Sequence, residues 1–170
     1  PKGAAHMELS QVDALPSCAS YQIPFRHLCN LLQTNAGDIE AVIASLPDVK
    51  AEQLERLRTR AKCAWYWITE CAPEDFRFAL RTDGSKAELA QAELSAVIKL
   101  RDEVVPKMDG VDEKGLSELV YAVAGECGLE PKALFTATYQ ALIGKDQGPR
   151  LANFMKIIGK DRLTAMLSAY

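Results

Sequence analysis

Helical periodicity is the feature that most constrains the fold of this chain. Apolar residues recur at steps of three and four along nearly its whole length, and proline or glycine closes most of these runs. The longest run covers residues 54–71 and stops at Pro73. Only Phe76, Phe78 and Leu80 alternate as in a strand, so residues 73–83 could be extended. The sequence predicts an all-α fold with about seven or eight helices.

Local signals at the ends of these runs set the expected helix boundaries. Ser85 and Glu88 form a capping-box pattern, which predicts a helix that opens at Ser85 and ends before Pro106. Pro131 suits the first turn of a later helix that ends at Gly144. The remaining helices are expected over 25–32, 39–46, 54–71, 116–128, 149–158 and 161–169. A turn at 83–84 could divide the helices into two packed subclusters.

Residues 1–7 resemble a cloning and protease-site remnant, which leaves 8–170 as one helical domain and suggests a fragment of a longer protein. With 48% hydrophobic and 25% charged residues, the composition is that of a soluble globular domain. No apolar stretch approaches the roughly 20 residues that span a bilayer, so no membrane partner is expected. The five cysteines contain no C-x-x-C pair, which predicts buried free thiols in a reducing cytoplasm rather than a metal site or disulfides.

The charge of the chain is unevenly distributed. The formal net charge of −3 argues against a sequence-blind nucleic-acid binder, and no DNA partner is expected. Residues 140–170 nevertheless carry five basic and two acidic side chains, which makes that segment +3 and leaves −6 for residues 1–139. A local basic site on an acidic body is therefore possible.

Residues with a catalytic pattern are hard to find. His27 is the only histidine outside residues 1–7, and its place beside an apolar helix face favours a surface or core-edge role over a general base. The paired carboxylates at 52/55 and 112/113 suit solvated or capping positions. No phosphate-binding loop, dinucleotide fingerprint or nucleophile elbow occurs. We therefore expect no catalytic residue, metal or cofactor in this chain.

Two segments carry chemistry suited to RNA. The first is 56–67, where Arg56 and Arg60 share one helix face, Arg58 and Lys62 another, and aromatic residues follow. Cations that hold phosphates, beside rings on which bases stack, are what single-stranded RNA recognition requires. The same pattern also fits a solvated face paired with carboxylates and aromatic residues in the core.

The second segment is 139–150, in which Gly144 and Gly148 bracket a turn and Pro149 prepares the next helix. Arg150 then lies in a first helical turn, against the positive end of the helix dipole. That placement is mildly unfavourable unless the arginine has an anionic partner. The partner is either an internal carboxylate or an RNA phosphate or base.

A resemblance to a known family adds to this interpretation. Residues 131–167, PKALFTATYQALIGKDQGPRLANFMKIIGKDRLTAML, resemble the C-terminal signature of class I lysyl-tRNA synthetases. The shared features are a Lys-x-x-Gly-Pro-Arg turn between two helices and a Gly-Lys-Asp-Arg turn before the last. Residues 23–26, 67–68 and 72–73 agree with the same family. Glutamyl-tRNA synthetases have a related helical region and a similar turn, so lysine and glutamate both remain open as the amino acid.

The resemblance implies a helical cage that receives the anticodon of tRNA, mainly tRNA-Lys. The parent enzyme would use ATP and Mg²⁺ in a catalytic domain of the same chain, and its "HIGH" and "KMSKS" signatures are absent here. Basic or aromatic side chains in the two segments, and on the helices that follow the second, are the expected RNA contacts: Arg58, Lys62, Trp65, Tyr66, Lys145, Arg150, Lys156 and Lys160.

Two other functions stay open at this point. A helical protein–protein interaction module would present a large exposed apolar patch. A small stand-alone enzyme would need a strongly perturbed carboxylate in a closed pocket.

Overall fold

The computed structural model describes residues 18–170, and these contain eight α-helices and no strand. Residues 1–7, interpreted above as a cloning remnant, lie outside the described part. The helices are α2 (Phe25–Thr34), α3 (Ile39–Ser45), α4 (Leu54–Tyr66), α5 (Gln91–Lys99), α6 (Glu113–Glu126), α7 (Pro131–Ile143), α8 (Leu151–Ile158) and α9 (Lys160–Leu167). Short 3-10 or π-helical turns cover 51–53, 67–71, 100–104 and 105–110. The predicted all-α fold is confirmed.

Most helix ends follow their sequence signals. The Asp38 side chain caps α3 by accepting a hydrogen bond from the Ala41 N–H (3.0 Å). Pro131 occupies the first turn of α7, and Gly144 closes that helix with a left-handed φ of 66°. Glycine tolerates this φ because it has no Cβ.

The helix predicted to open at Ser85 begins at Gln91 instead. The Ser85 hydroxyl donates to Asp83 Oδ1 (2.7 Å), so it caps a local turn rather than a helix. The reciprocal bond of the capping box comes from Glu93, whose Oε2 accepts from the Ala90 N–H (3.0 Å). The predicted stop before Pro106 is confirmed, since α5 ends at Lys99, the π-helical turn after it ends at Val104, and a separate 3-10 helix then covers Val105–Gly110. Proline is tolerated there because it lies at the start of a 3-10 turn.

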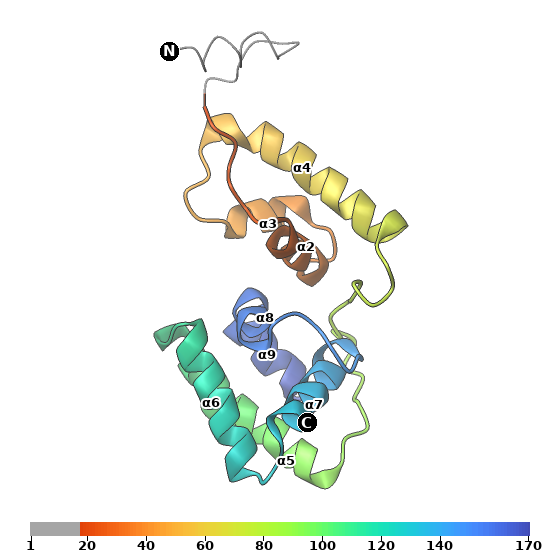
Figure 1. Ribbon diagram of the computed structural model, residues 1–170, viewed down its shortest axis with the longest axis vertical. Helices are drawn as coiled ribbons and strands as arrows, with labels where there is room; N and C mark the ends of the chain where they lie inside the picture. Colours follow the sequence, from red (N-terminus) through yellow and green to blue (C-terminus); the bar gives the residue numbers. More distant parts are fainter. Residues whose placement is uncertain (1–17) are drawn as a thin grey trace, which may run out of the picture.

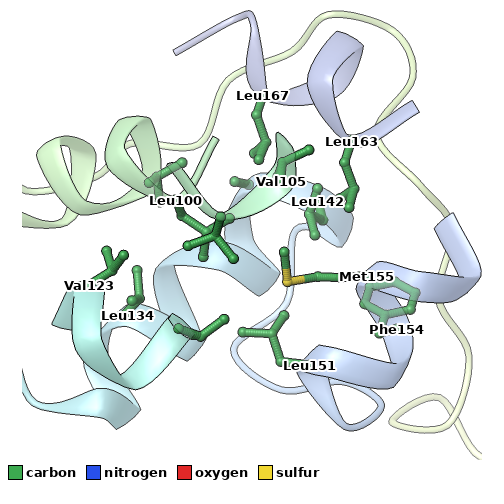
Figure 2. Close-up of a cluster of buried hydrophobic side chains, with 14 of the residues drawn as sticks. Leu100, Val105, Val123, Leu134, Leu142, Leu151, Phe154, Met155, Leu163 and Leu167 are labelled. Carbon is green, nitrogen blue, oxygen red and sulfur yellow. The ribbon is translucent and has the colours of Figure 1, made fainter. Parts of the chain in front are cut away.

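The helices pack into two hydrophobic cores, in agreement with the two subclusters suggested by the sequence. The first core is formed by α2, α3 and α4, and the second by α5 to α9 (Figure 1). Figure 2 shows the centre of the second core, where Leu142, Met155, Leu163 and Leu167 converge from α7, α8 and α9. The connector, residues 72–90, changes cores between Phe76 and Phe78, ahead of the turn at 83–84.

Polar contacts join the two cores at α2. The Gln33 amide accepts a hydrogen bond from the Phe78 N–H (2.7 Å) and donates to the Phe76 carbonyl (3.5 Å). The Arg162 Nη2 of α9 donates to the Thr34 carbonyl (2.7 Å), and its Nη1 donates to Asn35 Oδ1 (3.2 Å). Carbonyls in the last turn of a helix lack intrahelical partners and attract cations. Arg162 therefore caps α2 from the other core.

The expectation that all the cysteines are buried is wrong. Cys29 is fully buried, whereas Cys63 and Cys71 are exposed and Cys18 and Cys127 are half-buried. Burial raises the pKa of the Cys29 thiol to about 11. All five are free thiols, as expected. Among the described helices, none has both the length and the apolar character that a membrane crossing needs.

Replacing Arg162 with methionine tests the contact between the cores. The change removes the charged donor from the end of α2, so the free energy of unfolding should fall by about 1–2 kcal/mol. Chemical denaturation followed by circular dichroism measures the loss. Lys86→Met is the matched control, because Lys86 is exposed and has no side-chain partner among residues 18–170. Equal stability of the two variants would contradict a capping role for Arg162.

Candidate nucleic-acid interface

A groove lies where the two cores meet. It has a volume of about 600 Å³ and is lined by α2, by the connector and by the turn after α7. Its lining residues are Arg26, Asn30, Pro73, Asp75, Phe76, Arg77, Phe78, Ile143, Lys145, Asp146, Gln147, Gly148 and Pro149. Three of these are basic and two acidic, so the groove is weakly cationic within an acidic chain.

The turn over residues 144–149 forms one wall and is tightly held. A Cβ at Gly148 would lie 2.8 Å from Cε1 of the Tyr139 ring, so only glycine fits there without a shift. The Tyr139 hydroxyl donates to the Pro149 carbonyl, and burial raises its pKa to about 12, so it keeps its proton. The ammonium of Lys145 donates to the carbonyls of Glu74 and Arg77 and fastens the turn to the connector.

Arg26 and the ring of Phe76 also line the groove, and further aromatic side chains pack behind that ring. The Arg26 guanidinium lies 5.7 Å from the centre of the Phe76 ring, in a cation–π arrangement. Trp67 meets Phe76 edge-on at 5.0 Å between ring centres and meets Phe25 at 5.3 Å. These contacts fix the orientation of the Phe76 ring and leave the Arg26 side chain exposed. We call Arg26 and Phe76 the stacking shelf.

The basic residues predicted on α4 lie on the first core and do not line the groove. The Arg58 guanidinium donates to both carboxylate oxygens of Glu40 (2.7 and 3.0 Å) and to Glu55 (2.8 Å). The hydrogen bonds from Arg58 lower the pKa of the Glu40 carboxyl. The solvated face paired with carboxylates, weighed as an alternative above, thus describes Arg58. Lys62 is exposed one turn further along.

The two predicted aromatic contacts on α4 differ in their surroundings. The indole of Trp65 packs against the turn between α2 and α3, where a Cβ added to Gly37 would lie 2.4 Å from it. Trp65 therefore fills space in the first core. The ring of Tyr66 is 66% exposed and free to meet a partner.

The predicted basic residues of the C-terminal segment mostly bind main-chain carbonyls. Lys145 holds the connector, the Lys156 Nζ donates to the Val111 carbonyl, and the Lys160 Nζ donates to the Pro106 carbonyl (3.3 Å). Arg150 is exposed and has no side-chain partner among residues 18–170. It borders a second cavity of about 330 Å³ that Tyr121 and Phe135 also line. Lys145 and Arg150 thus stand at the two ends of the same turn.

Three lining residues of the groove, Arg26, Asn30 and Phe76, were missed in the sequence. Arg26 and Asn30 are four apart on α2, which places them on one helix face. Asn30 also interrupts the run of buried apolar residues from Leu28 to Leu32, and a polar residue at a core position is a usable signal. No group of three His, Cys, Asp or Glu side chains in the described part could hold a metal ion.

Alanine substitutions should separate the roles of Trp65 and Tyr66. Trp65→Ala leaves a cavity beside Gly37, so the free energy of unfolding should fall by about 2–4 kcal/mol. Tyr66→Ala removes an exposed ring and should change it by less than about 0.5 kcal/mol. Urea denaturation measures both. A large loss for Tyr66→Ala would show that this ring is part of the scaffold.

Comparison with protein families gives a match over the second half of the chain. The family model described as "Anticodon binding domain" matches residues 72–169. That range contains the connector, the turn over 144–149 and all of the second core.

Curated relatives match over nearly the whole chain. The "Lysine--tRNA ligase" of Treponema pallidum (strain Nichols) is 52% identical over 164 residues, which cover 96% of this chain and 31% of the relative. The protein of the same name from Borrelia garinii subsp. bavariensis is 34% identical over 96% of this chain and 32% of the relative. A third protein of that name, from Thermoplasma volcanium, is 32% identical over 88% of this chain and 30% of the relative. This chain thus spans about a third of their length.

Proposed function

This chain belongs to the anticodon-binding domain family, and we propose that it receives the anticodon loop of tRNA-Lys within a class I lysine–tRNA ligase. The groove between the two cores is the observation that carries the proposal. The amino acid rests on the names of the relatives, which are lysine–tRNA ligases in each case described above. The alternative of a glutamyl-tRNA synthetase finds no support among them.

The chemistry of the groove suits an unpaired RNA loop. Bases that leave the stack of a loop need flat surfaces, and the Arg26 guanidinium above Phe76 offers one. The phosphates between such bases need donors, and the candidates are two exposed side chains: Arg150, which follows the turn over 144–149 and lines the second cavity, and Tyr66 of α4. The exposed Lys62 is a further candidate for contact with the phosphates of the RNA backbone. Arg58, Trp65, Lys145, Lys156 and Lys160 would act indirectly, by holding these surfaces in place.

The rest of the reaction belongs to the proposed parent enzyme. Its catalytic domain would activate lysine with ATP and Mg²⁺ in the cytoplasm and transfer it to the end of the tRNA. The present chain would contribute specificity, by binding one anticodon loop more tightly than others. A protein-interaction module is not favoured, because the exposed large apolar side chains among residues 18–170 are only Phe25, Tyr66 and Tyr121.

A fluorescence-anisotropy titration tests the proposal. Anticodon stem-loops of tRNA-Lys and tRNA-Glu are titrated with the protein at two salt concentrations. The lysine stem-loop should bind more tightly, and its affinity should fall with salt with a logarithmic slope of about 1–2, as expected for a few phosphate contacts. Preference for the glutamate stem-loop would change the assigned amino acid. Absence of binding to either would contradict the proposed function.

Arg150→Glu should weaken binding of the lysine stem-loop about tenfold while the circular dichroism spectrum stays unchanged. The reason is that a charged donor worth about 1.5–3 kcal/mol becomes a repelling carboxylate. Lys86→Glu makes the same charge change at another exposed position and should have little effect. If Arg150→Glu unfolds the protein instead, Arg150 is a scaffold residue.

A further inference from the structure

Asn30 is a largely enclosed polar residue of the groove whose side-chain amide has no partner among residues 18–170. Its residue surface is only 8% exposed, and the exposed part opens into the groove that it lines. Its side-chain amide makes no hydrogen bond to any residue in 18–170. The amide atoms keep access to water through the groove, so a ligand that enters it can replace that water and bond to two N–H donors and one acceptor oxygen.

The second buried amide of α2 shows the contrast. Gln33 is 4% exposed, and its amide is hydrogen-bonded to the main chain of Phe76 and Phe78. Gln33 thus holds the connector in place, whereas Asn30, three residues earlier, faces the groove with its hydrogen-bonding groups free. The difference separates a structural amide from one that is available to a ligand.

The surroundings of Asn30 indicate what kind of ligand fits. Arg26, one helical turn earlier, carries its guanidinium above the Phe76 ring, and all three residues line the same groove. Asp75 and Asp146 also line it, and their carboxylates offset the charges of Arg26 and Arg77, which leaves little attraction for a phosphate. The Lys145 ammonium already donates to two main-chain carbonyls, so it is not available to a phosphate. A flat, uncharged group with hydrogen-bond donors and acceptors on its edge suits this lining better than a phosphate does.

We propose that Asn30 reads the edge of one unstacked anticodon base, while the stacking shelf of Arg26 and Phe76 receives the face of that base. This inference rests on the proposed function and adds the residue that contacts the base. The amide offers an N–H donor and a carbonyl acceptor side by side, which is the pattern that pairs with a base edge in two hydrogen bonds. The groove, at about 600 Å³, is large enough, since small-ligand sites span roughly 300–1,000 Å³.

Asn30→Asp is the decisive substitution, because it preserves shape and removes the donors. A carboxylate only accepts hydrogen bonds, and the Watson–Crick edge of guanine presents two donors together. The test uses the lysine stem-loop and three variants of it, in which each anticodon base in turn is replaced by guanine. Asn30→Asp should bind the unmodified stem-loop about tenfold or more weakly than the parent protein does. At one position, the guanine stem-loop should regain most of that loss.

Matched variants separate base reading from other effects. Asn153→Asp makes the same chemical change on α8, outside the groove lining, and should leave every affinity unchanged. Arg26→Gln removes the exposed guanidinium of the stacking shelf, and should weaken the binding of all four stem-loops several-fold without changing their order. Thermal melting of each variant shows whether it is folded.

The possible outcomes are distinct. If the parent protein binds the lysine stem-loop and Asn30→Asp keeps the same order of affinities, the reading role of Asn30 is overturned while the proposed function stands. If Asn30→Asp does not fold, the Arg26→Gln variant decides. Should it bind all four stem-loops as tightly as the parent protein does, the stacking shelf is overturned and the inference with it. If the parent protein binds no stem-loop, the proposed function itself fails.

Discussion

The contact between α2 and the C-terminal core is the interaction on which the groove depends. Helix α2 packs its apolar face into the first core, yet its last carbonyls are capped by Arg162 of the second. Gln33 fixes the connector at the point where the chain passes from one core to the other. The groove has one wall from each core, and these polar contacts, together with Ile157 of α8 packed against the first core, hold the two walls in place. Two separately packed helix clusters without them would leave no defined surface between them.

The use of cations in the C-terminal segment shows why net charge is a poor guide to a binding site. Residues 140–170 carry a charge of +3, which predicts a basic surface. In the structure, Lys145, Lys156 and Lys160 donate to carbonyls that helix ends and turns leave without partners. Their charge therefore stabilises the joints between elements. The sequence shows where a lysine stands but not which distant carbonyl lies within its reach.

The helices were predictable because their signals are local. Apolar spacing, Asp38, Pro131 and Gly144 act within a turn or two of the chain, and the helices follow them. The start of α5 was predicted wrongly for two local reasons. The Ser85 hydroxyl bonds to Asp83 instead of capping a helix, and Glu93 accepts from the Ala90 N–H, which sets the start of the helix further along the chain. The groove was largely missed for a different reason. Arg26, Asn30 and Phe76 come together with residues 145–149 only through tertiary packing, which no single-sequence pattern encodes.

The division of the groove walls between two cores also has a thermodynamic consequence. Two separately packed clusters have two local free energies of opening, which need not be equal. An occupant that touches α2 on one side and the turn over 144–149 on the other is lost when either cluster opens. Binding of the occupant therefore raises the free energy of opening of both clusters, by an amount that grows with the logarithm of the occupant's concentration. A filled groove makes the two clusters melt as one cooperative unit.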